Sequence, residues 1–503
     1  MITLDGRSLT LEQFESVVIR RVPCELAEQA RSDLLPARHL IDEVFARGAT
    51  VYGVNTGFGD LAEVSIPLEK TRLLQRRLLR SHAVGVGEPL SAATVRGMLL
   101  LRANTLACGH SGVRPELVDL LLSLLNKNLL PLIPSRGSVG ASGDLAPLAH
   151  LALPLIGEGR VAVGEKVVSG AEALEGAGLE PLRLEPKEGL ALINGTQGMT
   201  ALLALATLEA RRLMKAADLI GAMSTDAMRG TDTAFDARLH RLRPYRGQLA
   251  SARNLWKLLQ ESAIRESHRV DDVRVQDPYS IRCMPQVHGA VRDVIWDVEA
   301  KLGIEMNAVT DNPLVFPDDE EILSGGNFHG EPMAMAADFL AIGLAELGSI
   351  SERRIEKLLN HGFSGLPAFL TRQPGVNSGF MMTQVTAAAL VAENRILAHP
   401  ASVDSIPTSA DREDHVSMGM GAALKLHDVV GNVRFILAIE LLAACQGIDL
   451  LRPMTTSEIL EELHAAIRKQ VTCLEEDREM SEDISTVETF LRGAIDSHIE
   501  DLE

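Results

Sequence analysis

Apolar residues recur along most of the chain at the three-to-four-residue spacing of amphipathic helices. In the first part of the chain this spacing predicts helices near 10–13 and over 37–46, 68–80, 92–106 and 115–126. Later segments are longer and apolar on nearly every face, namely 199–225, 287–302, 331–359, 380–396 and 413–448. Helices of that second kind are typical of the interior of a large bundle or of a subunit interface.

Breaks in this pattern suggest how the chain is organised. Glycine-rich turns interrupt it at 51–60 and 134–147, and residues 151–183 are strand-like and loop-like, as in a small surface excursion. The last fifty residues are acidic and amphipathic and are expected to form an outer helical layer. We therefore expect an N-terminal domain over 1–197 and a long-helix bundle over 198–503.

Composition supports a mainly α-helical fold. Only 3% of the 503 residues are aromatic while 46% are hydrophobic, so the core must consist of Leu, Ala, Ile, Val and Met, which favours packed helices over a β-sandwich. The chain has 68 acidic and 49 basic residues, a net charge of −19. Such an acidic chain is poorly suited to bind a polyanion, so we expect no nucleic-acid partner.

Cysteine usage and the apolar stretches bear on location. Five scattered cysteines without a CxxC pair argue against a disulfide framework and against a zinc site, and indicate a reducing compartment. The polar N-terminus lacks the apolar core of an export signal, so we expect a cytoplasmic protein. The apolar stretches 332–350 and 418–444 contain charged residues that are expensive in lipid, so we interpret both as buried helices and expect no membrane partner.

The glycine-rich segments do not fit a phosphate-binding loop. Gly159 to Gly164 has the Walker spacing, but Glu165 follows where lysine is needed, and its charge would repel phosphate. No β-branched run leads into the glycines of 137–144, as a dinucleotide fingerprint requires. We expect neither a nucleotide nor a metal.

Residues 140–144 join four small side chains to an aspartate (Gly140-Ala141-Ser142-Gly143-Asp144). One interpretation is a helix entry capped by Asp144. Another is chemical: small residues permit so tight a bend that a backbone amide nitrogen can attack the carbonyl two residues upstream, cyclise, and lose water.

The segment Gly140 to Pro147 resembles the signature of the aromatic amino acid ammonia-lyases and aminomutases. The resemblance extends at least from Tyr52 to Leu450, because further family motifs follow in the family's order. These are Tyr52-Gly-Val-Asn-Thr-Gly-Phe-Gly59, Ser81-His82, Leu192-Ile-Asn194-Gly-Thr, Gln276-Asp-Pro-Tyr279-Ser-Ile-Arg282, Thr310-Asp-Asn-Pro313, Gly325-Gly-Asn-Phe328-His and Arg412-Glu-Asp-His415-Val-Ser-Met.

Within that family, three segments resemble the histidine ammonia-lyase branch, namely Ser81-His82, Gln276-Asp-Pro-Tyr279 and Glu413-Asp-His415-Val-Ser-Met. Ser81-His82 stands where the phenylalanine lyases typically carry Phe-Leu and the tyrosine lyases His-Leu, although some tyrosine aminomutases share the pair. The segment from Glu413 to His415 discriminates better, because those relatives tend to have Gln-Asp there. Asp411-Arg412 departs from the Asn-Gln of many relatives, which leaves the local pocket detail open.

The resemblance implies a self-made cofactor and a reaction. Ala141, Ser142 and Gly143 would cyclise to the electrophile 4-methylideneimidazole-5-one, with Ser142 losing its hydroxyl. The N-terminal domain would carry this ring, and homotetramers would build each active site from several subunits. The implied reaction converts L-histidine to trans-urocanate and ammonia, the first step of histidine degradation.

The resemblance also assigns roles to single residues that the spacing alone would treat as ordinary loop, core or ion-paired side chains. Tyr52 is the candidate base for the β-proton, in a loop with Gly53, Gly57 and Gly59 that would suit a mobile lid. His82 and Glu413 would recognise the substrate imidazole, and Arg282 would bind its carboxylate. The others would contact the ring or the substrate: Asn194, Gln276, Tyr279 and Phe328.

Two alternatives stay open from the sequence. The same scaffold could act on tyrosine or phenylalanine, as a lyase or a 2,3-aminomutase, since His82 could also bind a phenol. A catalytically inactive helical scaffold is the other, and the intact Ala-Ser-Gly triplet and Tyr52 argue against it.

Overall fold

The computed structural model describes the chain except for residues 49–50, 53, 58–63, 65, 271 and 273. It is mainly helical and divides into two compact units. The first contains Met1–Leu205, Val298–Asp338 and Pro400–Leu424, and the second contains Ala206–Asp297, Phe339–His399 and Lys425–Glu503. The expected division into 1–197 and 198–503 is linear, whereas these units interleave, because two later segments return to the first unit.

The first unit is built around helix α4 (Ala92–Ala107), of which all but the first two residues are buried. Ser91 caps α4 by accepting a hydrogen bond from the Thr94 amide, so the helix begins where the sequence predicted. The other helices of this unit are α1 (Leu11–Val18), α2 (Glu28–Ala46), α3 (Thr71–His82), α5 (Pro115–Asn126), α6 (Leu145–Ala152), α7 (Gly170–Gly176) and α8 (Glu188–Ile193).

Small sheets complete the first unit. Strands β1 (Ile2–Leu4) and β2 (Cys24–Leu26) pair in parallel, and β3 (Val86–Pro89) pairs antiparallel with β5 (Pro134–Arg136). The predicted surface excursion contains the hairpin of β6 (Arg160–Val163) and β7 (Lys166–Ser169), which joins β4 (Leu130–Pro131). A further hairpin pairs β8 (Leu314–Phe316) with β9 (Glu321–Leu323).

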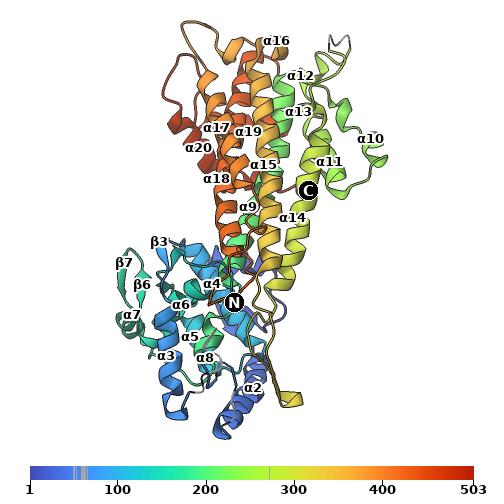
Figure 1. The fold of residues 1–503 in the computed structure, drawn as a ribbon. Coiled ribbons are helices and arrows are strands. Elements are labelled where there is room, and N and C mark those ends of the chain that lie inside the picture. Colours follow the sequence, from blue (N-terminus) through green and yellow to red (C-terminus); the bar gives the residue numbers. More distant parts are fainter. Residues whose placement is uncertain (49–50, 53, 58–63, 65, 271, 273) are drawn as a thin grey trace. The chain divides into compact units, whose positions relative to one another are not determined.

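Long helices dominate the second unit, where α15, α17 and α18 run along one another (Figure 1). These are α15 (Glu331–Leu359), α17 (Met381–Leu397) and α18 (Gly419–Leu451), together with α9 (Gln197–Ala227) and α14 (Met284–Glu305). Shorter helices complete the unit: α10 (Ala237–Arg241), α11 (Arg246–Leu258), α12 (Ala263–Glu266), α13 (Tyr279–Arg282), α16 (His361–Ser364), α19 (Glu458–Arg468), α20 (Ser481–Leu491) and α21 (Asp496–Ile499).

Two predicted helix starts are wrong. The helix predicted over 37–46 begins earlier, at Glu28, and the one predicted from 413 begins later. The pattern placed Glu413 in the first turn of a helix over 413–448, but α18 begins at Gly419. Ser409, Ala410, Asp411 and Met418 all have positive φ, which an α-helix cannot contain. Residues 408–418 instead form a loop that brings Glu413 back beside Thr408.

Among the described residues, one helix, Glu331–Leu359, has the length and hydropathy of a membrane span. Within its most apolar window, 67% of the residues are buried inside the protein. The helix thus covers the predicted buried segment 332–350.

Candidate active site

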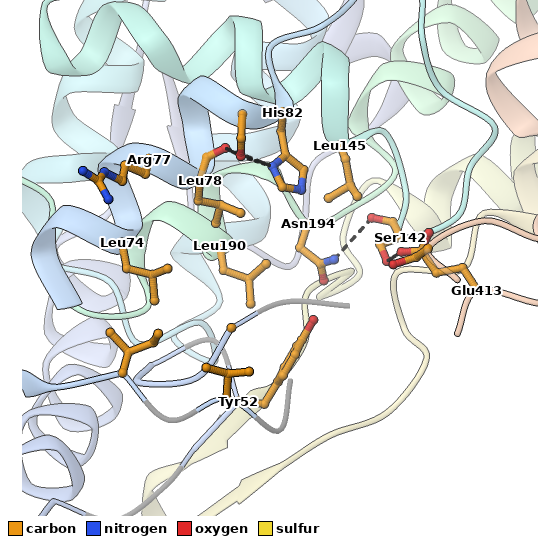
Figure 2. Close-up of a pocket in the computed structure, with 15 residues that line it drawn as sticks. Tyr52, Leu74, Arg77, Leu78, His82, Ser142, Leu145, Leu190, Asn194 and Glu413 are labelled. Carbon is orange, nitrogen blue, oxygen red and sulfur yellow. Dashed lines mark hydrogen bonds between the residues drawn. The ribbon is translucent and has the colours of Figure 1, made fainter. Parts of the chain in front are cut away.

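A cavity of about 470 Å³ lies in the first unit and brings several of the predicted residues together (Figure 2). Tyr52, His82, Ser142, Asn194 and Glu413 all line it. The rest of its wall is largely apolar and includes Leu74, Leu78, Leu145 and Leu190, with Arg77, Ser81 and Ser409 at polar positions. Such a cavity, apolar with a few converging polar groups, is the usual form of a small-molecule site.

The Ala-Ser-Gly loop is bent as tightly as its sequence suggested. Gly140 and Gly143 have positive φ, of 75° and 72°, and Ala141 forms a β-bridge with Gly143. Gly143 also lies against Gly195 so closely that a Cβ on Gly143 would be 2.0 Å from the Gly195 oxygen. Only glycine fits that position, so the residues present fit the internal cyclisation that the resemblance implies.

Two hydrogen bonds hold this loop to the segment that follows α8. The Asp144 amide donates to the Gly195 oxygen at 2.7 Å, and Asn194 Nδ2 donates to the Ser142 carbonyl at 3.3 Å. Asn194 Oδ1 is buried and has no hydrogen-bond partner among the described residues. Asn194 thus fixes the serine carbonyl with one side-chain atom while the other can accept a hydrogen bond from a bound molecule.

Asp144 precedes α6, but its side chain makes no capping bond there, so the predicted cap is wrong in detail. Its carboxylate instead accepts the Met199 amide in the first turn of α9 at 2.8 Å and the Ser138 hydroxyl at 3.0 Å. Complete burial raises the pKa of this carboxyl to about 6, although the Met199 and Ser138 hydrogen bonds oppose the shift. Asp144 therefore ties the loop to α9.

His82, at the end of α3, faces the cavity as a neutral imidazole. Its Nδ1 is 3.0 Å from the Leu78 carbonyl, and since a carbonyl only accepts, Nδ1 carries the proton. Nε2 is then left as an acceptor. Burial lowers the pKa of His82 below its usual value, against the opposing effects of the Leu78 carbonyl and of Glu413.

Glu413 is held by the loop that replaces the expected helix start. Its Oε2 accepts the Thr408 hydroxyl at 2.7 Å, while its Oε1 accepts the Ser142 hydroxyl at 3.2 Å. Backbone hydrogen bonds run both ways between Thr408 and Glu413, of 2.9 and 3.3 Å. The three residues between them, Ser409 to Asp411, have the left-handed backbone conformation, which non-glycine residues adopt at a cost. Backbone strain of this kind is concentrated at functional sites.

Tyr52 lies across the cavity, with its hydroxyl directed into the group of labelled side chains (Figure 2). Nearby, Asn55 accepts the Val51 amide through its side chain at 2.8 Å and the Ile66 amide through its carbonyl at 2.9 Å. Of the predicted lid glycines, Gly57 lines the cavity, while Gly53 and Gly59 lie outside the described residues.

The other predicted site residues are not part of this cavity's lining. Gln276, Tyr279 and Arg282 belong to the second unit, where Arg282 lies over the Tyr279 ring at 4.4 Å and donates to the Asp277 carbonyl. Tyr279 is 69% exposed. Phe328 is half-buried in a turn before α15, and the next residue, His329, interacts with the His415 carbonyl at 3.2 Å.

Sequence reasoning missed two residues that support the site. Thr408 holds Glu413, and nothing in its local pattern distinguishes it from any loop threonine. Arg102 lies behind Asn194, where its Nη1 donates to the Asn194 carbonyl at 2.7 Å. Its signal was visible, because a charged residue stands in the middle of the apolar run Met98 to Leu106.

Comparison with known proteins identifies the family of this chain. The family model for aromatic amino acid lyases matches residues 9–469. The chain belongs to the aromatic amino acid lyase family.

Its similarities within the family are extensive. The chain is 53% identical to a histidine ammonia-lyase of Koribacter versatilis, over 97% of each chain. It is 52% identical to one of Symbiobacterium thermophilum, over 96% of this chain and 95% of that one. Among solved structures, the histidine ammonia-lyase of Trypanosoma cruzi matches with a TM-score of 0.92 at 47% identity, over 99% of this chain and 95% of that one. A tyrosine aminomutase of Streptomyces globisporus matches with a TM-score of 0.95 at 38% identity, over 100% and 98%.

Proposed function

We propose that this protein deaminates L-histidine without oxidation, giving trans-urocanate and ammonia. The observation that carries the proposal is the convergence of a neutral His82 and the carboxylate of Glu413 on the cavity that contains Ser142. The two ring nitrogens of the substrate differ, one donating and one accepting. His82 Nε2 can accept from the substrate imidazole, and Glu413 can accept from the other ring nitrogen when it is protonated or from the ammonium group.

The cofactor would be the 4-methylideneimidazole-5-one ring made from Ala141, Ser142 and Gly143. The Gly143 nitrogen attacks the Ala141 carbonyl carbon. One water leaves with the Ala141 oxygen and the two amide hydrogens of Ser142 and Gly143, and a second leaves with the Ser142 hydroxyl and α-hydrogen. The ring supplies an electrophile that no ordinary side chain offers.

This chain's own residues would do the rest. Tyr52 would take the β-proton, which requires that its pKa be brought below the usual value near 10. Arg282 would bind the substrate carboxylate, and Asn194 and Gln276 would hydrogen-bond the substrate or the Ser142 carbonyl. Tyr279 and Phe328 would pack near the reacting atoms. As the family resemblance implies, we further propose a homotetramer whose active sites combine residues of several subunits.

A reducing, cytoplasmic location fits the five cysteines, which are all free in the structure.

The test is an ultraviolet assay of the purified protein with L-histidine, L-tyrosine and L-phenylalanine side by side, with Ser142→Ala as the control. We expect urocanate from histidine alone and none from Ser142→Ala. Coumarate or cinnamate would instead favour the tyrosine or phenylalanine alternative. Absence of product with all three substrates would contradict the proposed activity.

The role of Glu413 can be tested separately. If Glu413 binds the imidazole rather than the ammonium group that both substrates share, Glu413→Gln should reduce turnover of histidine much more than any residual turnover of tyrosine. An equal fall in both activities would overturn the role given to Glu413.

A further inference from the structure

Arg102 is a fully buried cation whose hydrogen-bonding capacity is only partly used. It lies in the middle of α4 with an exposure of 0%. Its Nη1 donates to the Asn194 carbonyl at 2.7 Å and to Gln197 Oε1 at 3.0 Å. Among the described residues, Nε and Nη2 have no hydrogen-bond partner.

The charges around Arg102 do not balance. Lys187 is also fully buried, and its Nζ is 2.7 Å from Asp311 Oδ2. Among the described residues, Asp311 is the carboxylate that acts on both cations, so the cluster of Arg102, Lys187 and Asp311 has one positive charge in excess. A buried charge without a full partner costs several kcal/mol, and a well-packed apolar residue would often be more stable. Stability alone therefore does not explain an arginine at this position.

The position of Arg102 relative to the Ala-Ser-Gly loop offers an explanation. A Cβ on Gly195 would lie 2.5 Å from Gln197 Oε1, 2.7 Å from Arg102 Nη1 and 2.8 Å from the Thr310 oxygen, so the guanidinium and the acceptor that it holds are packed directly against Gly195. On its other side, Gly195 is in contact with Gly143. The Asn194–Gly195 segment is thus packed between Arg102 and the residues that would cyclise.

Hydrogen bonds also connect Arg102 to the Ala-Ser-Gly loop through Asn194. Arg102 holds the Asn194 carbonyl, and Asn194 in turn donates from its side chain to the Ser142 carbonyl. The second acceptor of Arg102, Gln197, is itself fixed by donating to the hydroxyls of Thr105 at 3.1 Å and Thr310 at 2.8 Å. Both acceptors of the Arg102 guanidinium, Asn194 and Gln197, are therefore held in place by further hydrogen bonds of their own.

We propose that Arg102 is a positioning residue for the self-modification: it holds Asn194 and Gly195 against Ser142 and Gly143 in the bend that lets the Gly143 nitrogen reach the Ala141 carbonyl. This inference rests on the proposed function, because it concerns formation of the ring. It adds a residue that does not touch the substrate and acts through Asn194 and Gly195.

Arg96 provides a matched control on the same helix. It is also buried, at 4% exposure, and it donates to backbone carbonyls of Val17, Val18 and Leu125, away from the Ala-Ser-Gly loop. Replacing it removes a buried arginine from α4 without touching Asn194. A general weakening of the first unit and a specific loss of positioning can therefore be told apart.

The experiment compares wild type, Arg102→Met, Arg102→Lys and Arg96→Met by intact mass, melting temperature and steady-state kinetics. Ring formation removes two waters, about 36 Da. We expect wild type and Arg96→Met to be fully modified, Arg102→Met to be at least tenfold less modified, and Arg102→Lys to recover part of the loss. Turnover per modified chain should change less than the modified fraction does.

The outcomes separate a failure of the role given to Arg102 from a failure of the proposed function. Complete modification of Arg102→Met would overturn the inference, and so would equal losses of modification in Arg102→Met and Arg96→Met. If Arg102→Met does not fold, Arg102→Lys carries the test, since a fully modified lysine variant with wild-type kinetics would also overturn it. An unshifted mass in wild type would instead contradict the proposed function itself.

Discussion

Each unit of this protein buries a cluster of charged residues, and the two clusters differ in how completely they are satisfied. In the second unit, Arg354 pairs with Glu440 at 2.6 Å and Arg292 pairs with Asp218 at 2.5 Å. His288 joins the two pairs, at 2.7 Å from Asp218 and 3.3 Å from Arg354. No side-chain nitrogen or oxygen of these five residues is among the unpartnered buried atoms of the described chain.

The first unit shows the opposite arrangement. Within the described part of the chain, Arg102 keeps two unpartnered nitrogens, Asn194 keeps an unpartnered oxygen, and the cluster of Arg102, Lys187 and Asp311 has one positive charge in excess. Stability alone can explain the complete cluster of Arg354, Glu440, Arg292, Asp218 and His288, whereas the cluster around Arg102 needs a further explanation. Here the incomplete cluster lies directly behind the loop that we propose to be modified.

The largest expected effect comes from breaking the complete cluster. Arg354→Met leaves Glu440 buried with only the hydroxyls of Ser224 and Ser351, so we expect a loss of about 3–5 kcal/mol of stability. Denaturant unfolding measures the loss, and intact mass should show normal modification of the chains that fold. The double variant Arg354→Met with Glu440→Leu should recover most of the stability. A single variant within about 1 kcal/mol of wild type would contradict the comparison.

Two buried aspartates, Asp144 and Asp218, make the difference between the two units measurable in the pH dependence of stability. Burial raises the pKa of Asp144 to about 6, whereas Asp218 is equally buried but its pKa is lowered, because Arg292 and His288 outweigh burial. A raised pKa means that the folded state binds the proton more tightly, so Asp144 contributes stability at low pH that is lost as pH rises from about 4 to about 6. Asp218 contributes stability at neutral pH that is lost as pH falls.

We therefore expect opposite pH trends from Asp144→Asn and Asp218→Asn. The stability of wild type relative to Asp144→Asn should fall by about 3 kcal/mol between about pH 4 and pH 6, from the 1.4 kcal/mol that each pKa unit represents. The stability of wild type relative to Asp218→Asn should rise with pH. Urea midpoints at several pH values measure both trends, and parallel trends would show that the two sites do not differ in this way.

A smaller effect is expected at the strained loop beside the cavity. Thr408→Val removes the hydroxyl that Glu413 accepts, which should cost about 1.5 kcal/mol, roughly tenfold in kcat/KM for histidine. Thr408→Ser keeps the hydroxyl and should retain most of the activity. Steady-state kinetics with both variants checks this, and equal activity of the valine and serine variants would exclude a role for the hydroxyl.

The smallest effect is expected where charges are exposed. Arg76 and Arg80 on α3 pair with Glu158 at the surface. Exposed pairs of this kind contribute little. Arg80→Gln should leave the melting temperature and the modified fraction unchanged within error, and a clear loss of either would show that this surface has a partner.

The sequence predicted the helices whose pattern decides their structure locally. The predicted starts at 92, 115 and 331 are the observed starts, and each has a clear signal: Ser91 caps α4, Pro115 stands at the first turn of α5, and Gly330 precedes α15. The start at 413 was wrong because Met418, inside the predicted helix, has a positive φ, as do residues 409–411 before it, and since none of these residues is a glycine the sequence gives no sign of it. Their conformation depends on contacts with distant parts of the chain, such as the Met418 amide with the Val139 carbonyl.

As with the helices, the sequence predicted those residues of the candidate site whose signal is local in the chain. Residues within contiguous motifs, such as His82, Ser142 and Asn194, could be identified from the chain, and the structure brings them to one cavity. Thr408 could not be, and Arg102 was visible only as a charged residue within an apolar segment, because the roles of both arise from neighbours that are distant in sequence. Asn194 is 92 positions from Arg102.

The contacts of the Ala-Ser-Gly loop also set an order of events during synthesis. Gly195 stands against Gly143, Arg102 depends on residues as late as Thr310 and Asp311, and Ser417 donates to the Gly140 carbonyl at 3.4 Å. A growing chain acquires these neighbours long after residues 141–143 have left the ribosome. If the fold drives the modification, the nascent polypeptide stays chemically inert. The electrophile then arises only in molecules that have completed the fold around residues 141–143. Truncated or misfolded products would never carry a reactive group into the cell.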